Sequence, residues 1–307
     1  QKLNVDLIIQ SINEGNFNDI AFTVERGVLE QATTLASSLI PTLRGASEDI
    51  DTVALVNDTK IAKVSIAGAG MIGRPGVAAK MFSTLAAAGV NIQMIATSEV
   101  KVSCTIAEED CDRTIAALCK AFDLNQSPAR LDESTQVAGP AVRGVALDRN
   151  QARLALRYVP DQPGMAAKLF QILADRGISV DMIIQAQRCR EHNGLQTRDI
   201  AFTVAQADAT MASDVLQSLA TEFGGSEIVV DTAIAKVSVV GIGMIMEPGT
   251  AAKMFQALAD SNINIQMIAT SEIKISCVVA EESGVDALKA VHEVFGLAGS
   301  QEIEVPA

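Results

Sequence analysis

The residues best suited to binding a ligand gather around a Pro-Gly pair in the second half of the chain. Asp161 precedes Pro163-Gly164, and Asp181 and Gln185 follow in the next strand-like run. A Pro-Gly pair at a helix start leaves backbone N–H groups and the positive dipole end beside a residue that permits close approach, which suits a carboxylate. The two acids could bind an ammonium group, and Gln185 could donate or accept hydrogen bonds. A structural interpretation stays open, because an acid can also support a helix N-terminus and an amide can bond a neighbouring strand.

A glycine-rich stretch, Gly68 to Gly73, fits the GxGxxG pattern that binds dinucleotide phosphates between a strand and a helix. The corresponding stretch 241–246 ends in Met246 and lacks the third glycine. The surrounding unit is also too short for a parallel nucleotide-binding half, and the chain has no GxxxxGK[ST] loop. We therefore predict no cofactor in this chain. A nucleotide-dependent enzyme stays an alternative, which NAD or ATP would support by raising the melting temperature.

Histidine and cysteine residues show no pattern of a metal site. His192 and His292 have no Cys or Asp nearby at ligand spacing. The five cysteines contain no CxxC pair and are odd in number, which favours a reducing compartment and a cytoplasmic location. Cys104 and Cys277 lie at equivalent apolar strand positions, so we expect both in the core. We expect the same of the repeated methionines Met71, Met81, Met94, Met244, Met254 and Met267.

Charge and hydropathy exclude two classes of partner. The 24 basic and 37 acidic residues give a net charge of -13, which opposes the phosphate neutralisation that nucleic-acid binding requires. Apolar stretches such as 229–246 are interrupted by charges at Asp231 and Lys236, so no run is long enough to span a membrane. Aromatic residues make up only 3%, which predicts a core of small aliphatic side chains.

An internal duplication organises the chain. Residues 62–122 realign without a gap with residues 235–295, and the nonapeptide NIQMIATSE occurs in both. A second type of unit contains VDxIIQ followed by DIAFTV, at 5–24 and again at 180–204. The two types alternate along the chain. They differ in chemistry, because the duplicated type carries Gly73 or Met246 in place of Asp161, and Gln93 or Gln266 in place of Asp181. A ligand held between two unlike units would explain this difference.

Each complete unit has the pattern strand, helix, two strands, helix. In the last unit we expect these elements at 236–240, 248–262, 263–271, 273–280 and 285–295. Pro75, Pro163 and Pro248 mark the expected first helical positions, where proline costs no hydrogen bond. The order predicts an α+β fold of tandem ferredoxin-like βαββαβ units with antiparallel sheets.

The repeats also predict the unit boundaries. The first unit covers 1–60, and we expect its front end to be missing, because the stretch LRYVPDQPGMAAKLFQILADRG of the third unit has no counterpart before Leu3. The second unit covers 61–127, a polar linker and lead-in with two prolines covers 128–152, the third unit covers 153–233 and the fourth covers 234–307.

Three stretches resemble one family. VRGVALDR at 142–149, PDQPGMAAKLF at 160–170 and NIQMIATSEIKIS at 264–276 resemble the regulatory region of aspartokinases, which consists of tandem ACT domains. The resemblance covers essentially the whole chain. Aspartokinases commonly carry two ACT units, and four units resemble the cyanobacterial members.

The resemblance implies feedback inhibition by threonine, lysine or both, bound between paired ACT units. Carried over residue by residue, one effector site would contain Asp161, Gln162, Pro163, Gly164, Met165, Ala166, Ser179, Val180, Asp181 and Gln185 with Ala251, Ala252, Ile265, Gln266, Glu272 and Ile273. The other would contain Asn4, Val5, Asp6 and Gln10 with Ala78, Ala79, Ile92, Gln93, Glu99 and Val100. The sequence does not say which units pair.

The resemblance also implies a partner. The kinase domain that would bind ATP, Mg²⁺ and aspartate is absent, so we expect no catalytic residue in this chain and an effect exerted on a catalytic domain. Exposed edges of ACT sheets predict at least a homodimer. The main alternative is an amino-acid-binding ACT module of another enzyme or of a transcription regulator. A transcription regulator should carry a basic DNA-binding element, which this sequence lacks.

Overall fold

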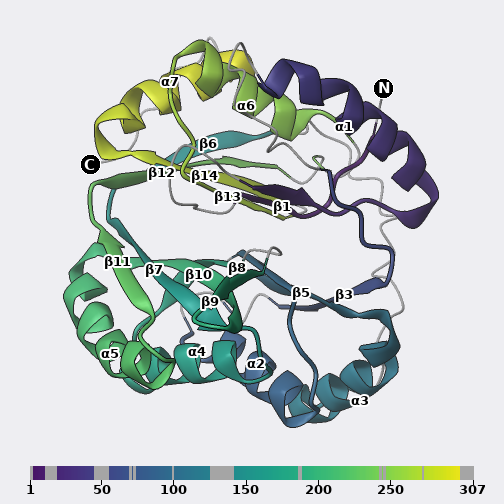
Figure 1. The fold of residues 1–307 in the computed structure, drawn as a ribbon. Helices are drawn as coiled ribbons and strands as arrows, with labels where there is room; N and C mark the ends of the chain where they lie inside the picture. The colour runs from purple at the N-terminus through teal and green to yellow at the C-terminus, as the bar shows by residue number, and fades with distance from the viewer. Residues whose placement is uncertain are drawn as a thin grey trace.

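Two layers of β-sheet face each other across the centre of the molecule, and helices cover both outer faces (Figure 1). Among the described residues, one layer is an eight-stranded sheet, and the other consists of a four-stranded and a two-stranded sheet. The computed structural model describes residues 3–10, 19–44, 55–68, 71, 74–98, 100–124, 142–185, 189–241, 244, 247–271 and 273–297. One core lies under the helices of each layer, and another lies between the two sheets. Helices and strands with one apolar face are buried most completely in layers of this kind.

The third unit has every element of a βαββαβ unit. In chain order these are β7 (Gln151–Pro160), α4 (Met165–Asp175), β8 (Val180–Gln185), β10 (Leu195–Ala205), α5 (Ala209–Glu222) and β11 (Glu227–Asp231). A short strand, β9 (Arg190–His192), forms a hairpin with the start of β10. The strands are antiparallel in the order β11-β7-β10-β8. This arrangement confirms the predicted ferredoxin-like fold.

The second and fourth units repeat most of this pattern. The second contains β3 (Ile61–Ala67), α2 (Val77–Ala87), β4 (Met94–Ser98), β5 (Lys101–Ala107) and α3 (Cys111–Phe122). The fourth contains β12 (Ile234–Val240), α6 (Thr250–Asp260), β13 (Met267–Thr270), β14 (Lys274–Ala280) and α7 (Gly284–Val294). The described part of the first unit contains β1 (Ile8–Gln10), β2 (Ile20–Phe22) and α1 (Leu29–Arg44). One turn of 3-10 helix leads into each of α1, α3, α5 and α7.

One strand comes from the segment that the sequence analysis assigns to the linker and lead-in. β6 (Gly144–Asp148) pairs antiparallel with β12, so the sheet of the fourth unit has the order β13-β14-β12-β6. β6 thus takes the edge position that β11 takes in the third unit. The third unit is therefore inserted in the chain between two neighbouring strands of the fourth. The free edge of β12 explains the pairing, since its backbone groups need partners.

The helices after the Pro-Gly pairs begin later than predicted. α2, α4 and α6 start two residues after the proline, and the residue before each helix is Gly76, Gly164 or Gly249 with φ of 94°, 98° and 102°. The proline lies in the turn that precedes the helix instead of in its first turn. The chain changes direction here through a residue in the left-handed backbone conformation, which glycine adopts without steric strain.

The second and third units join edge to edge. β4 and β8 pair antiparallel through Ile95–Gln185 and Ala96–Ile184, so the lower sheet runs continuously from β11 to β3. On its outer face α2 packs against α4, with the rings of Phe82 and Phe170 5.4 Å apart. Such a ring pair contributes about 0.5–1.5 kcal/mol beyond its buried area.

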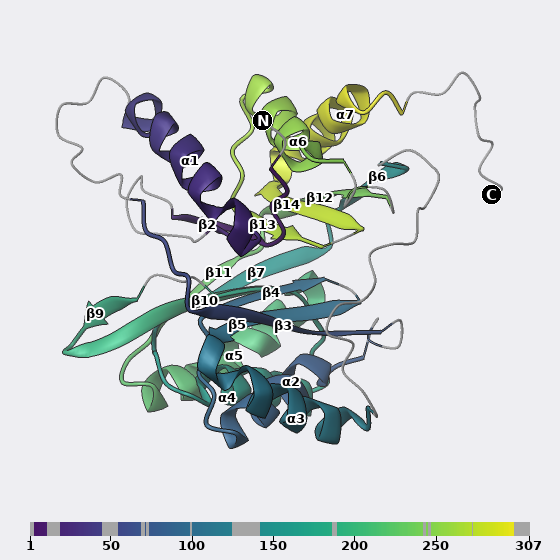
Figure 2. The same ribbon diagram turned by 90° about the vertical axis from the view of Figure 1, so that its right-hand side faces the viewer.

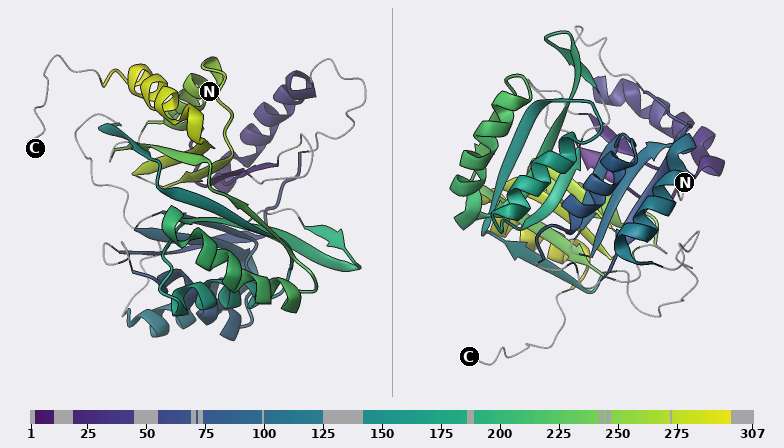
Figure 3. Two further views of the ribbon diagram at one scale, coloured as in Figure 1. Left: turned by 90° about the vertical axis from the view of Figure 1, so that its left-hand side faces the viewer. Right: turned by 90° about the horizontal axis from the view of Figure 1, so that it is seen from below.

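The first and fourth units form the other layer, where β1 lies beside β13 (Figure 1). Figure 2 shows the strands of the two layers facing each other from a second direction. Seen from the side and from below, α2 to α5 cover one outer face and α1, α6 and α7 the other (Figure 3). The core between the sheets consists of Leu7, Ile9, Met94, Ala96, Ala155, Met182, Ile184, Ala201, Ile234, Met267, Ala269 and Val278. The first and fourth units therefore share one layer, and the second and third units share the other.

The cysteine and methionine positions confirm the core predictions. Cys104 and Cys277 are fully buried, and burial raises the pKa of both thiols far above the ordinary range. Five of the repeated methionines are buried, and Met71 packs against the core while partly exposed. Within the described ranges, no helix is long and apolar enough to cross a membrane, and no three His, Cys, Asp or Glu side chains are placed to hold a metal ion.

Candidate functional site

Where the second and third units join, the start of each of the helices α2 and α4 lies beside the end of the other. A Cβ atom on Gly76, before α2, would lie 3.7 Å from that of Ala174 near the end of α4. A Cβ atom on Gly164, before α4, would lie 3.8 Å from that of Ala86 near the end of α2. No side chain caps either helix, so the first backbone N–H groups can bind an anion. The two starts are related by approximate twofold symmetry, and each borders a cleft.

The first cleft lies between the start of α4 and the residues that precede β4. It is lined by Phe82, Val90, Asn91, Ile92, Val159, Pro160, Asp161, Gln162, Pro163, Gly164, Met165, Ala166, Ala167, Gln185, Arg198 and Ile200. Its free volume is only about 20 Å³. Gln185 closes one side by donating its Nε2 to the carbonyl oxygen of Ile92 at 2.8 Å. The amide therefore joins the two units.

The acid of the first cleft already has a cationic partner. The Nε of Arg198 lies 2.9 Å from Oδ1 of Asp161, and its Nη2 donates to Oδ2 at 3.0 Å. Asn91 and the Cys189 thiol also donate to this carboxylate, each at 3.0 Å. Burial raises the pKa of Asp161, but hydrogen bonds from Arg198, Cys189 and Asn91 outweigh it, and the pKa lies below its ordinary value. The carboxylate is thus ionised and fully partnered.

A backbone irregularity places Asp161 at this cleft. Tyr158 has a φ of 60°, unusual for an aromatic residue, where the register of β7 and β10 shifts. The carboxylate of Asp199 accepts the N–H of Tyr158 at 3.1 Å, and the Tyr158 ring stacks on His192 with centroids 3.9 Å apart. The bulge turns the end of β7 towards α4. Asp161 then donates its N–H to Gln196 at 2.8 Å.

The second cleft is the counterpart of the first under this approximate twofold symmetry and is much larger, about 320 Å³. It is lined by Met71, Arg74, Pro75, Gly76, Val77, Ala78, Ala79, Thr97, Ser98, Val102, Asp148, Gln151, Phe170, Ala174, Ile178, Ser179, Val180, Asp181, Ile183 and Lys236. The start of α2 lies on one side and the start of β8 on the other. Asp148 on β6 and Lys236 on β12 belong to the opposite layer, and Gln151 is the first residue of β7. Both layers therefore contribute to this cleft.

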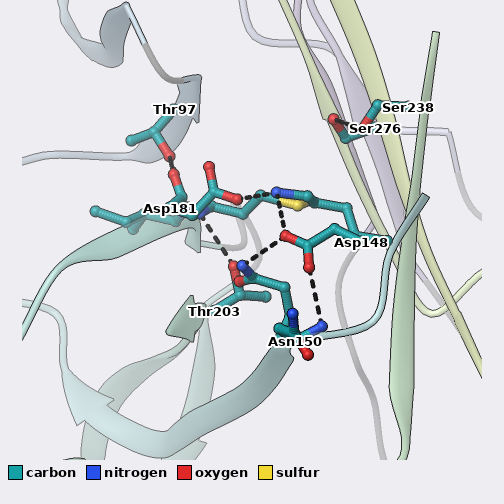
Figure 4. Close-up of polar contacts among 11 residues, drawn as sticks. Thr97, Asp148, Asn150, Asp181, Thr203, Ser238 and Ser276 are labelled. Atoms are coloured by element: carbon teal, nitrogen blue, oxygen red, sulfur yellow. Dashed lines mark hydrogen bonds and ion pairs between the residues drawn. The ribbon is translucent and has the colours of Figure 1, made fainter. Parts of the chain in front are cut away.

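Hydrogen bonds of one threonine fix the wall of the second cleft. Thr97 on β4 donates its hydroxyl to the carbonyl oxygen of Asp181 at 3.0 Å (Figure 4). The same hydroxyl accepts the N–H of Ile183 at 2.7 Å. The same contacts recur between the first and fourth units, where Thr270 donates to Asp6 and accepts from Ile8. The first unit thus meets the fourth as the third meets the second.

The structure divides the predicted effector residues differently from the sequence grouping. The first cleft contains Asp161, Gln162, Pro163, Gly164, Met165, Ala166 and Gln185 with Ile92, and the second contains Ser179, Val180 and Asp181 with Ala78 and Ala79. Within this chain the edge strand of the third unit therefore pairs with the edge strand of the second. In each complete unit the strand after the first helix lies at the edge of the unit's own sheet, so the sequence of this strand does not determine which other unit pairs with it. The packing of α2 on α4 and of the two sheet faces makes that selection.

The other predicted residues lie partly in the opposite layer. Gln10 donates to the carbonyl oxygen of Ile265 at 2.9 Å, and Gln266 accepts from Arg153 at 3.0 Å. The carbonyl oxygen of Gln93 accepts from Arg198 at 2.8 Å. Asn4, Val5 and Asp6 precede β1, Ala251 and Ala252 lie in α6, and Val100 and Ile273 precede β5 and β14. Glu99 and Glu272 lie outside the described residues. An effector-binding role for all of these residues stays a prediction.

Sequence reasoning did not single out the partners that complete the clefts. Arg198, Asn91 and Cys189 surround Asp161 in the first cleft, and Arg74, Asp148 and Lys236 line the second. The duplication carried a signal for two of them, because Asn91 and Lys236 occupy positions that are identical in both copies.

Comparisons with known proteins agree with this architecture. Models of the ACT domain match residues 64–122, 155–224 and 237–295, within the second, third and fourth units. The fold and these matches define a protein of tandem ACT domains.

Three relatives indicate the family. The crystal structure of an aspartate kinase from Synechocystis has a TM-score of 0.91 and 58% sequence identity, covering 99% of this chain and 52% of that chain. An aspartate kinase of Stutzerimonas stutzeri is 45% identical over 167 residues, which are 54% of this chain and 39% of the relative. An aspartokinase of Thermus thermophilus is 48% identical over 157 residues, 51% of this chain and 38% of the relative.

The chain belongs to the aspartokinase family, as an ACT-domain regulatory region. It spans about two fifths of these two curated relatives, at 39% and 38%, and about half of the Synechocystis chain, at 52%.

Proposed function

We propose that this chain binds free threonine and lysine in clefts between ACT units, and that binding inhibits phosphorylation of aspartate by the catalytic domain of the whole protein. The second cleft is the main support for this proposal. It combines an uncapped helix start, a carboxylate at Asp181 and an open volume of about 320 Å³.

The chemistry of the second cleft suits an α-amino acid. The α-carboxylate would bind the N–H groups at the start of α2, where the helix dipole is positive. The α-ammonium would bind Asp181 on the opposite wall. The hydroxyls of Thr97, Ser98 and Ser179 line the same space. A zwitterion therefore finds both complementary charges within one cleft.

The balance of charges predicts that the cleft between the second and third units and the cleft between the first and fourth units prefer different effectors. In the second cleft Arg74 and Lys236 balance Asp148 and Asp181, which favours threonine, because its side chain is uncharged. At the corresponding position before α6, residue 247 is Glu and not Arg. The extra negative charge between the first and fourth units favours lysine. Binding of both effectors would then allow concerted inhibition.

The first cleft would act as a two-state element. A ligand ammonium can reach Asp161 only by displacing the Arg198 guanidinium, which also donates to Gln93 of the second unit. Binding thus requires a rearrangement between units. An effector shifts such an equilibrium by its difference in affinity for the two states, typically about 1–3 kcal/mol per ligand.

The remaining chemistry belongs to the whole protein. We propose that ATP and Mg²⁺ serve only the catalytic domain, that this chain contributes no catalytic residue, and that the protein acts in the cytoplasm as a homodimer. The relationship to aspartokinases and the absence of a Walker-type loop in the sequence support this division.

Calorimetric titration with threonine, lysine and both tests the proposal. We expect saturable binding that Asp161→Ala, Gln185→Ala and Asp181→Ala each weaken by about tenfold or more, the loss of one good polar contact. Asp214→Ala and Gln217→Ala, exposed substitutions of the same types on α5, serve as controls and should leave binding unchanged. No binding of either amino acid to the folded chain would refute the proposal.

A further inference from the structure

A lysine of the fourth unit reaches across the interface between the two layers. Lys236 lies on β12, and its ammonium forms an ion pair with Asp181 on β8 of the opposite sheet. The same ammonium lies 3.6 Å from the carboxylate of Asp148 on β6. Figure 4 shows Asp181 and Asp148 pointing towards one another from the two layers. The side chain of Lys236 is only 8% exposed. A lysine buried to this extent requires such partners.

The neighbours of Lys236 hold it in place. Burial raises the pKa of Asp148, but the N–H of Asn150, the amide of Gln151 and the ammonium of Lys236 outweigh it and lower that pKa. Asn150 and Gln151 both donate to this carboxylate at 2.9 Å (Figure 4). Asp148 is therefore ionised and fixed to the turn that leads into β7. Asp148 and Asp181 both line the second cleft, and Asp181 is the partner of Lys236 that comes from the opposite layer.

The same contact exists in the other half of the duplication. Lys63, the counterpart of Lys236 on β3, forms an ion pair with Asp6, the counterpart of Asp181. These side chains are 32% and 44% exposed, so solvent screens the pair more strongly. A contact found in both halves belongs to the architecture of the layers. The difference in burial makes Lys63 a matched control.

The ammonium of Lys236 has two carboxylate partners, Asp181 and Asp148. An arriving ammonium group can therefore take Asp181 while Lys236 keeps Asp148. The exchange separates the sheet of the third unit from that of the fourth at this point. We propose that Lys236 is a positioning residue that competes with the effector ammonium for Asp181 and so transmits the occupancy of the second cleft to the opposite layer. This inference rests on the proposed amino-acid binding.

Affinity measurements on the full chain test the competition. Because Lys236→Met removes the competitor, we expect the Kd of threonine to fall by about three- to tenfold, at or above the upper end of the range for an exposed ion pair. Lys236→Arg keeps a cation at this position and should bind threonine more weakly than Lys236→Met does. Lys63→Met should leave the Kd unchanged. An unchanged or higher Kd in Lys236→Met would overturn the proposal, since the lysine would then be purely structural or bind the ligand itself.

Amide hydrogen exchange measures whether threonine binding changes the opposite layer, which contains β6 and β12. Threonine should accelerate amide exchange in β6 and β12 of the unsubstituted chain and of Lys236→Arg, and should change neither strand in Lys236→Met. Equal responses in all three would overturn the proposal. If Lys236→Met does not fold, Lys236→Gln takes its place, because its amide can still donate to Asp148. Failure of the unsubstituted chain to bind any amino acid would instead refute the proposed function.

Discussion

At the scale of single residues, the acid and amide of the first cleft could be predicted from the sequence, but their partners could not. Asp161 and Gln185 stand beside a recognisable Pro-Gly pair, whereas Arg198 lies far along the chain on β10 and reaches Asp161 only through the hairpin. Its cationic group occupies the place where a ligand ammonium was expected. A charge carried by a distant strand leaves no local pattern near the acid that it neutralises.

The ionised state of Asp161 predicts a pH-dependent stability. Its pKa is lowered on folding, so the unfolded chain binds the proton more readily and this contribution to stability is present above the ordinary pKa of 3.8. Asp161→Asn should therefore reduce the free energy of unfolding at neutral pH. The reduction should shrink as the pH falls below 3.8. Urea titrations across this range, with Asp214→Asn as control, measure it, and a deficit independent of pH would contradict the assignment.

The charge of Arg74 should influence which effector the second cleft prefers. Arg74→Glu gives this cleft the residue found before α6, so threonine affinity should fall and lysine affinity rise, each by about two- to fivefold for an exposed charge. The shift should shrink in high salt. Calorimetry at two salt concentrations checks it, with Arg74→Gln expected to fall between the two. Identical preferences in all three chains would remove charge balance as the basis of selectivity.

At the scale of elements, periodicity predicted the strands and helices of the fourth unit closely. α6 was expected at 248–262 and spans Thr250–Asp260, because its apolar spacing and the preceding Pro-Gly pair define it locally. β6 was missed, because a strand of five residues has little periodicity and its partner β12 lies far along the chain. The left-handed glycine before α2, α4 and α6 was also missed, since Pro-Gly fits either a turn or a first helical turn.

The pairing of β4 with β8 depends on the hydroxyl of Thr97. Thr97→Val removes both of its hydrogen bonds and leaves the buried N–H of Ile183 without that partner, so we expect a loss of about 1–3 kcal/mol in the free energy of unfolding. Thr97→Ser keeps the hydroxyl and should retain most of the stability. Denaturant unfolding monitored by circular dichroism measures both. Equal stability of the valine and serine variants would show that the hydroxyl does not hold the two strands together.

At the scale of the whole molecule, the repeats predicted four units of two alternating types but not their arrangement. The units share one fold and one free strand edge, so the sequence pattern is compatible with several pairings. The core between the sheets, which includes Met182 and Met267, selects the observed one by shape and apolar area. The arrangement of the units depends on how the side chains of the two sheets fit together in space, and this fit produces no repeat or motif in the sequence.

Sheet edges predict association of the whole chain. β3 pairs only with β5 and β11 only with β7 among the described strands, so both ends of the lower sheet offer unpaired backbone groups. We expect at least a dimer, because such edges tend to pair with another chain. Light scattering over a range of concentrations measures this. A constant monomer mass at high concentration would contradict the expectation.

The central claim is that amino acids bind in the clefts between units. A crystal structure of the chain grown with threonine and lysine tests it most directly. We predict electron density for an amino acid in the second cleft, with its carboxylate at the start of α2 and its ammonium at Asp181. Density only outside the clefts, or empty clefts in crystals whose lattice leaves them open to solvent, would contradict the account.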